Sequence, residues 1–399
     1  MKLIKRNAYL RELKSLMNTP DIKVITGVRR CGKSRLMNDF SDEIKKKDKA
    51  ANIIHVNFNL TDFEEQLEYH ALEQYAENRY EEGKNNYLLI DEVQMCEHFE
   101  KAVNSLHSRE KYDIYVTGSN AFLQSSDLAT LFVGRTYEVH VFPFSFDEYT
   151  EYYPCENIYK SLTDYMTEGG MAGSYLYSNE TQKYRYLNTE VLNALIVRDI
   201  VKKHRLRNEP LLHELTDFLT DNAGSIVSVR SIEQSLAKGG TKADHKTISR
   251  YIEYLCRAYA FYKVRRYDIK GKRYLRSEDK YYLSDHSFKY ARLGTKNMDY
   301  GHVLENIAAI ELMRRGYELY VGTLHKKEID FVAIKQGEKL YIQVAYDISE
   351  QKTFDREASP LLDIRDAYPK MIIARTYQPE YQYEGIRVID AAQWLKSVE

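Results

Sequence analysis

Two glycines, a lysine and a serine stand at fixed spacing in the stretch Gly27-Val28-Arg29-Arg30-Cys31-Gly32-Lys33-Ser34. Glycines allow a loop to curl until its backbone N–H groups face inward, and a helix that begins behind such a loop attracts anions. A lysine at this position reaches β- and γ-phosphate oxygens, and the hydroxyl after it is a ligand for Mg²⁺. The spacing therefore predicts a site for ATP and Mg²⁺, with Lys33 on the phosphates and Ser34 on the metal.

The residues on either side of this loop support the same interpretation. The run KVIT precedes the loop and SRLMNDF opens a helix after it, so the loop joins a strand to a helix, as a phosphate site requires. Cys31 stands beside cationic residues at a helix start, a setting that favours a reactive thiolate. We therefore expect alkylation of Cys31 to block ATP binding, unless it is only a filler residue. The loop residues expected next to the nucleotide are Gly27, Arg30, Cys31, Gly32 and Arg35.

A pair of carboxylates follows a second apolar run. YLLIDEVQ places Asp91 and Glu92 at the C-terminal end of a predicted strand, the edge at which ligands gather in doubly wound sheets. Asp91 can hold Mg²⁺ through water, and Glu92 can polarise the water that attacks ATP. The stretch DIYVTGSN ends another strand with polar groups, of which we expect Asn120 to sense the γ-phosphate. The alternatives are an acidic helix cap for the pair and an ordinary turn for Asn120.

Strand-like and helix-like segments alternate over the first 150 residues or so. The strands are apolar throughout, which indicates a parallel sheet covered by helices on both faces. The predicted fold is therefore an α/β P-loop domain over residues 1–155, followed by a helical lid or connector over 156–210. The predicted strands are IKVIT, NIIHVNF, YLLIDEV, DIYVTGS and YEVHVF.

Four stretches, GVRRCGKS, LLIDEVQ, VTGSN and LFVGRT, resemble those of the AAA+ ATPases. Together with GGMAGSY and the C-terminal GHVLENIAAIELMRRGY, KEIDFVA and YIQVAY, they resemble the prokaryotic AAA+ family that carries a restriction-endonuclease-like domain. The resemblance implies a ring-type homo-oligomer in which an arginine of a neighbouring subunit completes each ATP site. Arg135 is the candidate by position. Arg29, Arg30 and Arg198 compete for this role, and a structural ion pair is the alternative for Arg135.

Basic residues are concentrated in one segment, although the net charge is −1. Residues 238–276 hold twelve Lys or Arg and three acids, whereas residues 61–100 hold two basic and twelve acidic side chains. Over residues 211–288 the order of helices, Gly-rich turn and basic hairpin matches a winged-helix domain, whose second helix enters the major groove of DNA. We therefore expect DNA as a partner, with docking to a protein as the alternative. The candidate contacts are Lys242, His245, Lys246, Arg250, Lys270, Lys272 and Arg273.

Three residues of the segment 289–399 resemble a nuclease site. Glu305 on a helix, with Asp330 and Gln343 on facing strands, is similar to the arrangement in PD-(D/E)XK nucleases, where acids hold Mg²⁺ and a lysine orients water. The last motif normally ends in an acid, any residue and lysine, but here it reads Gln343-Val344-Ala345. Lys326 or Lys327 could supply the cation from the neighbouring strand. We favour a nuclease-like fold with structural acids slightly over an active nuclease.

The composition restricts the class of protein further. No run approaches the roughly 18 apolar residues of a membrane span, and the charged start MKLIKRNAYLREL does not fit a secretory signal. We expect a cytoplasmic ATPase without a membrane partner. Its nucleotide state would reposition the C-terminal domains on DNA or on a partner protein. The alternatives are an ATP-gated nuclease and a slow nucleotide-dependent assembly switch.

Overall fold

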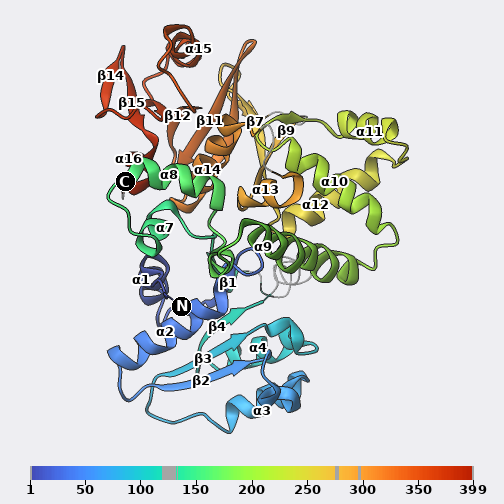
Figure 1. Cartoon of the computed structure of the whole chain (residues 1–399). Coiled ribbons are helices and arrows are strands. Elements are labelled where there is room, and N and C mark those ends of the chain that lie inside the picture. The colour runs from blue at the N-terminus through green and yellow to red at the C-terminus, as the bar shows by residue number, and fades with distance from the viewer. Residues whose placement is uncertain (1, 119–131, 133, 275–277, 295–297, 398–399) are drawn as a thin grey trace. The chain divides into compact units, whose positions relative to one another are not determined.

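The computed structural model describes residues 2–118, 132, 134–274, 278–294 and 298–397. The chain forms two compact units, an N-terminal unit, Lys2–Val141, and a C-terminal unit, Phe142–Glu399 (Figure 1). The division falls at residue 141, so the helices directly after it belong to the C-terminal unit. No helix within the described ranges is long and apolar enough to cross a membrane.

A five-stranded parallel sheet with the order β2-β3-β4-β1-β5 forms the centre of the N-terminal unit. Strands β1, β3 and β4 are buried along their whole length, because helices cover both faces of the sheet. The α/β prediction is confirmed, and each predicted strand is present. The strands are β1 (Ile22–Thr26), β2 (Asn52–Asn57), β3 (Asn86–Asp91), β4 (Asp113–Thr117) and β5 (Thr136–His140).

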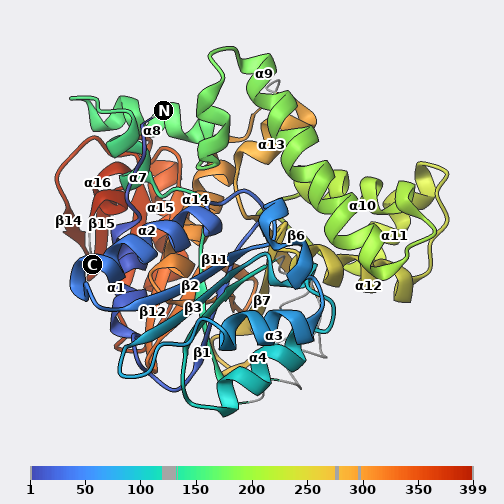
Figure 2. The ribbon, with the colours of Figure 1, turned by 90° about the horizontal axis from the view of Figure 1, so that it is seen from below.

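Helices pack on both faces of this sheet. The apolar residues of α3 (Tyr69–Glu77) and α4 (Phe99–Ser108) share one core with alternate strand residues, and Figures 1 and 2 show these two helices side by side. On the other face, Phe40 of α2 (Lys33–Lys47) contacts Tyr115 of β4, with ring centroids 4.8 Å apart. The predicted acidic helix is a 3-10 helix, Thr61–Gln66, followed by α3, and α1 (Asn7–Ser15) packs against α2.

The first half of the C-terminal unit is mainly helical. Its helices follow one another along the chain as predicted, with a helical connector first and paired helices after it. The helices are α7 (Phe146–Tyr152), α8 (Ile158–Glu168), the 3-10 helix Ala172–Leu176, α9 (Glu180–Arg185), the π-helical turns Tyr186–Asn193 and Leu195–Lys202, α10 (Glu209–Asp221), α11 (Val229–Lys238), α12 (His245–Arg257) and α13 (Ser287–Leu293).

The glycine pair Gly169-Gly170 of the predicted lid holds a buried carboxylate. The backbone N–H of Gly170 donates to Asp285 Oδ2 at 2.7 Å. A Cβ on Gly169, whose φ is +74°, would lie 2.2 Å from Asp285 Oδ1. The glycines are therefore required where the end of α8 meets the segment after β9 (Asp279–Leu283).

A ten-stranded sheet runs through the C-terminal unit in the order β14-β15-β13-β12-β11-β10-β7-β9-β6, with β8 paired to β7. β7 pairs antiparallel with β9 at one end and parallel with β10 at the other. The predicted hairpin is therefore part of this sheet, and the boundary predicted at residue 288 falls between strands of one sheet. The remaining strands are β6 (Ile226–Val227), β7 (Phe261–Asp268), β8 (Arg273–Tyr274), β10 (Glu318–Leu324), β11 (Lys327–Lys335), β12 (Glu338–Ala345), β13 (Lys370–Ala374), β14 (Tyr381–Tyr383) and β15 (Ile386–Asp390).

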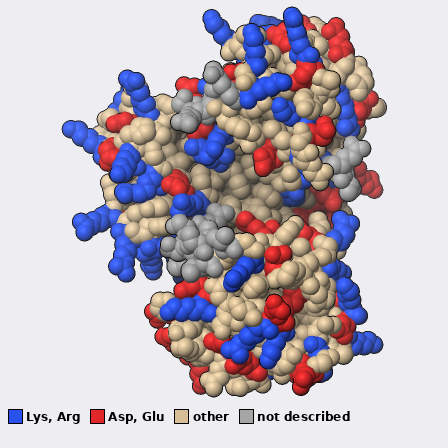
Figure 3. All heavy atoms as spheres, turned by 180° about the vertical axis from the view of Figure 1, so that it is seen from behind, with Lys and Arg blue, Asp and Glu red and all other residues tan. Residues whose placement is uncertain are grey.

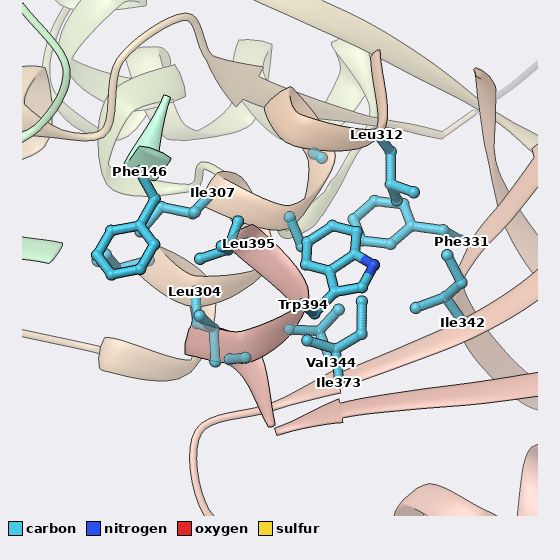
Figure 4. Close-up of a cluster of buried hydrophobic side chains, with 14 of the residues drawn as sticks. Phe146, Leu304, Ile307, Leu312, Phe331, Ile342, Val344, Ile373, Trp394 and Leu395 are labelled. Carbon is cyan, nitrogen blue, oxygen red and sulfur yellow. The ribbon is translucent and has the colours of Figure 1, made fainter. Parts of the chain in front are cut away.

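Trp394 of α16 (Ala391–Lys396) lies at the centre of the cluster of buried apolar side chains in Figure 4. Its ring lies near Phe331 of β11 and Val344 of β12, and residues of α14 (Tyr300–Arg314) belong to the same core. Helix α15 (Gln351–Leu362) packs against β12. This packing fixes α14 against β11 and β12, the elements that carry Glu305, Asp330 and Gln343.

Candidate nucleotide-binding site

The loop between β1 and α2 has the backbone that its glycines predict. Gly27 has φ +137°, and a Cβ there would lie 2.1 Å from the carbonyl oxygen of Val141, so no other residue fits. Gly32 has φ +105°, and a Cβ there would meet nothing within 4 Å. The loop is therefore closed at its start against Val141, the residue after β5, and open at the N-terminus of α2, where the first N–H groups of a helix have no intrahelical acceptor.

Lys33 holds the two ends of this loop together. Its side chain is buried, and Nζ donates to the carbonyl oxygens of Gly27 at 2.8 Å and Val28 at 3.3 Å. Ser34 lies next to it in the first turn of α2 and is half-buried. An ammonium, a hydroxyl and free backbone N–H groups therefore lie at one helix start, the donor set that binds phosphate oxygens.

The other predicted loop residues differ in exposure. Arg30 is exposed at φ +66°, and Arg35 is exposed and pairs with Asp39 at 2.9 Å. Cys31 is only 5% exposed, and its Sγ would lie 2.9 Å from a Cβ on Gly27. The accessible thiol that we expected from the sequence is therefore not seen, because the loop folds over the sulfur, and an alkylating reagent needs the loop to open first.

Buried Arg6 supports the loop from outside it. Its side chain is 3% exposed, and Nη1 donates to the carbonyl oxygen of Cys31 at 3.2 Å. The guanidinium also lies 4.6 Å from the ring centroid of Tyr9 in α1. Sequence reasoning missed this residue because Arg6 is part of the charged segment that precedes α1, and no spacing links it to the loop.

The carboxylates lie one strand away from the phosphate loop. β4 separates β1 from β3, and since neighbouring strands lie about 4.8 Å apart, the ends of β1 and β3 are about 10 Å apart. Asp91 is buried, and Thr117 at the end of β4 donates its hydroxyl to Asp91 Oδ1. The same hydroxyl accepts a hydrogen bond from the Glu92 N–H at 3.3 Å. Gln94 Nε2 donates to Glu92 Oε2.

Thr117 therefore positions both acids. Thr117 is one of the polar residues that end this strand, whereas Asn120, the residue predicted for the sensing role, lies outside the described residues. Glu92 has φ +57°, a left-handed conformation that is uncommon for residues other than glycine and that recurs at functional sites. The bond from Thr117 to the Glu92 N–H supports this turn.

A histidine missed by sequence reasoning lies beside the start of the loop. His140, at the end of β5, lies opposite Thr26 in the register, with Nδ1 2.8 Å from the Thr26 hydroxyl oxygen. Burial and the nearby Lys33 ammonium lower the pKa of His140 to about 3. His140 is therefore neutral near pH 7 and adds no second cation next to Lys33. His140 could have been found from the sequence, because it lies near the end of the strand-like run YEVHV and ligands gather at such strand ends.

Arg135 lies at the opposite end of β1 from the loop. The N–H of Ile22 donates to the Arg135 carbonyl oxygen at 2.8 Å, and the Arg135 side chain is exposed. Four residue steps of about 3.3 Å separate Ile22 from Thr26, so Arg135 starts about 13 Å from the loop edge. Within its own chain it does not lie at the phosphate site. The competitor Arg198 is exposed in the C-terminal unit.

The predicted DNA contacts lie mainly around the start of α12. Lys242, His245, Lys246 and Arg250 are exposed, and Figure 3 shows Lys and Arg side chains standing out over α10, α11 and α12. Within the described ranges, none of these four forms an ion pair, whereas Arg257, Lys263 and Arg266 are paired with acids. Lys270 and Lys272 are exposed, and the Arg273 side chain lies outside the described part.

The three residues of the predicted nuclease-like site are brought together. Gln343 Oε1 accepts from the Asp330 N–H at 2.7 Å, and Lys280 Nζ lies 2.8 Å from Glu305 Oε1 and 3.9 Å from Asp330 Oδ1. The cation thus comes from Lys280 of β9 and not from the strand that we predicted. Lys327 instead donates to Ser359 and Asp363, and Lys326 is exposed.

Residues 19–150 match the family model described as AAA domain, and residues 159–299 match a domain of unknown function, DUF8612. A protein of Haemophilus influenzae, described as uncharacterized, is 35% identical over 399 residues and covers 98% of both chains. The chain belongs to this family of AAA-domain proteins. A second relative of the AAA-domain protein, "Uncharacterized protein MJ1544" of Methanocaldococcus jannaschii, is 29% identical over 359 residues, 85% of this chain and 77% of the relative.

Two solved structures are distantly similar to the AAA-domain protein. The Aeropyrum pernix ORC1 protein in complex with DNA is 11% identical, with coverage of 79% of this chain and 94% of that chain and a TM-score of 0.30. AMPPCP-bound DnaA from Aquifex aeolicus is 17% identical, with coverage of 64% and 88% and a TM-score of 0.32. These TM-scores are too low for the likeness to carry functional information.

Proposed function

We propose that this AAA-domain protein binds and hydrolyses ATP with Mg²⁺, and that its nucleotide state controls how the C-terminal unit engages DNA. The observation that supports the first part is the loop from Gly27 to Ser34, with Lys33 bound to its inner carbonyl groups and the N-terminus of α2 open beyond it. The acids after β3, one strand away, support hydrolysis in addition to binding.

Each residue of the site has a defined part in this proposal. Lys33 and the N–H groups at the start of α2 would bind the phosphates, and Ser34, together with Asp91 through water, would hold Mg²⁺. Hydroxyl and carboxylate oxygens fit this ion, which proteins hold through one or two carboxylates together with substrate phosphates. The ion supplies positive charge to the phosphate oxygens. Glu92, oriented by Gln94, accepts a proton from the attacking water.

Thr117→Val should lower the ATPase turnover about 10- to 100-fold while the dissociation constant for ATP stays within about threefold. Valine keeps the shape but loses the hydroxyl that orients Asp91 and the Glu92 N–H, and loss of an outer-shell partner of a metal ligand costs about this much. Steady-state kinetics and calorimetry measure the two quantities. Thr117→Ser is the matched control and should retain most of the turnover. Equal turnover in Thr117→Val and wild type would contradict the positioning role.

The geometry around Arg135 supports a homo-oligomer. Arg135 is exposed next to the edge strand β5 and starts too far from its own loop to contact phosphates there, so the site of another copy is the target that we propose. An arginine supplied by a neighbour stabilises charge on the γ-phosphate in the transition state. We therefore place Arg135 in the site of an adjacent subunit, with Asn120 as the γ-phosphate sensor within the chain.

DNA engagement is supported by the basic surface at α12. The order α10, β6, α11, α12, β7, β8, β9, with β9 between β6 and β7 in the sheet, supports the interpretation as a winged-helix domain. The unpaired cations Lys242, Lys246 and Arg250 are then available for phosphate contacts, which bind DNA without sequence preference. Lys270, Lys272 and Arg273 would track the phosphates from the turn and from β8.

The test is ATPase turnover of the full chain with Mg²⁺, measured alone and with duplex, branched or single-stranded DNA. We expect one form of DNA to stimulate turnover. Lys246→Glu should abolish the stimulation and leave the basal rate unchanged, whereas Lys160→Glu, at an exposed lysine of α8, should change neither. In binding assays Lys246→Ala should reduce the slope of log affinity against log salt by about 1.

The outcomes of this test separate the candidate functions. If no DNA binds or stimulates, the DNA part of the proposal is wrong and a protein partner takes its place. ATP binding with almost no turnover in any condition would support a slow nucleotide switch. If the folded protein binds no ATP, the whole proposal is wrong.

A further inference from the structure

Three carboxylates of the C-terminal unit converge on one buried ammonium group. Lys280 Nζ lies 2.8 Å from Glu305 Oε1, 2.7 Å from Glu328 Oε1 and 3.9 Å from Asp330 Oδ1. Lys280 is 3% exposed. Its partners come from α14 and β11, whereas Lys280 is on β9. The ammonium therefore fills the centre of the acidic cluster.

The strand order does not predict the contact between Lys280 of β9 and the acids of β11. β7 and β10 lie between β9 and β11 in the sheet, yet the rings of Tyr282 on β9 and Phe331 on β11 have centroids 5.6 Å apart. Side chains of the two strands therefore meet across the curved sheet, and Lys280 points the same way as Tyr282 because residues two apart share a face.

Further hydrogen bonds hold the residues of the cluster in place. Tyr282 donates its hydroxyl to Glu305 Oε1 at 2.6 Å, and the Val344 N–H donates to Asp330 Oδ2 at 2.8 Å. Gln343 Oε1 accepts from the Asp330 N–H, and its Nε2 donates to Glu357 Oε2 at 3.0 Å. Gln343 thus ties β11 to α15 and does not present a free oxygen as a metal ligand.

The charges in the cluster depend on each other. Burial lowers the pKa of Lys280, but the carboxylates of Glu305, Asp330 and Glu328 outweigh burial and raise it above its usual range. Burial and the Glu305 carboxylate raise the pKa of Asp330 well above its usual range. Removing Lys280 would leave buried carboxylates without a cation. Such a change is strongly destabilising, because the buried charge that remains is not compensated.

A divalent metal ion does not fit these residues while Lys280 is present. It would need the oxygens of Glu305 and Asp330 that surround the ammonium, and it would be repelled by the positive charge. Within the described residues no three His, Cys, Asp or Glu side chains are arranged to hold a metal ion, so Glu305, Glu328 and Asp330 would have to move together before a metal could replace the ammonium. The negative charge of these acids is therefore already compensated by Lys280, a residue of the same chain.

We propose that Lys280 is a built-in cation that takes the place of the metal ion in this nuclease-like part, so that Glu305, Glu328 and Asp330 join β9 to α14 and β11 and do not support metal-dependent DNA cleavage. The segment that carries α11 and α12 ends in β9. The ion pairs of Lys280 therefore connect this segment, which carries the basic surface at α12, to α14 and β11.

The test removes the ammonium and asks whether a metal site appears. In nucleotide-free full-length protein we expect Lys280→Ala to bind one more equivalent of Mn²⁺ than wild type, measured by calorimetry, and this equivalent should be absent from Lys280→Ala/Glu305→Gln. Lys263→Ala, which frees the single acid Asp279, is the matched control and should gain none.

Two further measurements keep the proposal testable if Lys280→Ala folds poorly. Lys280→Gln retains a side chain of similar length, and Mn²⁺ should raise its Tm but not that of wild type. Wild type should not cleave supercoiled DNA with Mg²⁺ or Mn²⁺ above the level of Asp330→Ala. A wild-type Mn²⁺ site lost in Glu305→Gln, cleavage lost in Asp330→Ala, or folded Lys280 variants without any gain of Mn²⁺ binding would each overturn the proposal.

Discussion

Lys33→Ala should weaken ATP binding at least about 100-fold and abolish measurable turnover. Hydrogen bonds from a charged donor contribute about 1.5 to 3 kcal/mol each, and two bonds to β- and γ-phosphate oxygens therefore correspond to at least about 3 kcal/mol, more than a factor of 100 in the dissociation constant. Calorimetry with Mg²⁺ and ATP on folded protein measures the loss directly.

The control must separate lost ligand contacts from a damaged loop. Lys33 Nζ also donates to the Gly27 and Val28 carbonyl oxygens, so Lys33→Ala should lower the Tm by a few degrees as well. Lys45→Ala, at an exposed position of the same helix, should leave affinity and Tm unchanged. The loop has no part in nucleotide binding if Lys33→Ala, still folded by circular dichroism, retains wild-type affinity.

The N-terminal unit was predictable because its signals are local. Each buried strand of the sheet is mainly apolar, and the spacing from Gly27 to Ser34 specifies the loop without knowledge of the rest of the chain. The position of Asp91 after YLLI places it at the strand end by the same logic. The strands and the backbone of the loop depend on residues adjacent in the sequence and were predicted correctly, whereas the burial of Cys31 depends on how the loop folds and was not.

Contacts between distant segments were not predictable in the same way. Thr117 reaches Asp91 because β4 lies beside β3, and the sequence does not give the strand order. Arg6 reaches the Cys31 carbonyl group only once α1 is packed. Lys280 lies just beyond the basic segment 238–276 and was not singled out, although its spacing from Tyr282 in DKYYL placed both on one buried face.

The hairpin between β7 and β9 shows the limit of periodicity. Alternation of buried and exposed residues in β7 shows which face each side chain takes. It does not reveal that one end of the strand pairs with β9 and the other with β10. The predicted winged-helix and nuclease-like segments therefore share a sheet that no local pattern could indicate.

Glu92→Gln should lower turnover about 100- to 1,000-fold and leave ATP affinity within about threefold of wild type. Glutamine keeps the size and can still bond to Gln94, but it cannot accept a proton from water, and general-base catalysis contributes about 10²- to 10⁴-fold. Single-turnover hydrolysis and calorimetry measure the two effects. Glu97→Gln, at a neighbouring acid with a side chain 67% exposed, should change neither quantity.

The two variants together decide between an ATPase and a nucleotide-binding protein. Lys33→Ala removes binding in both cases, so it cannot tell them apart, whereas Glu92→Gln changes the rate only where Glu92 activates water. Gln94→Ala should fall between Glu92→Gln and wild type, at about a 10-fold loss, because it removes the group that orients Glu92. If Glu92→Gln turns over as fast as wild type while Lys33→Ala binds no ATP, the phosphate loop is functional but the base is a different residue.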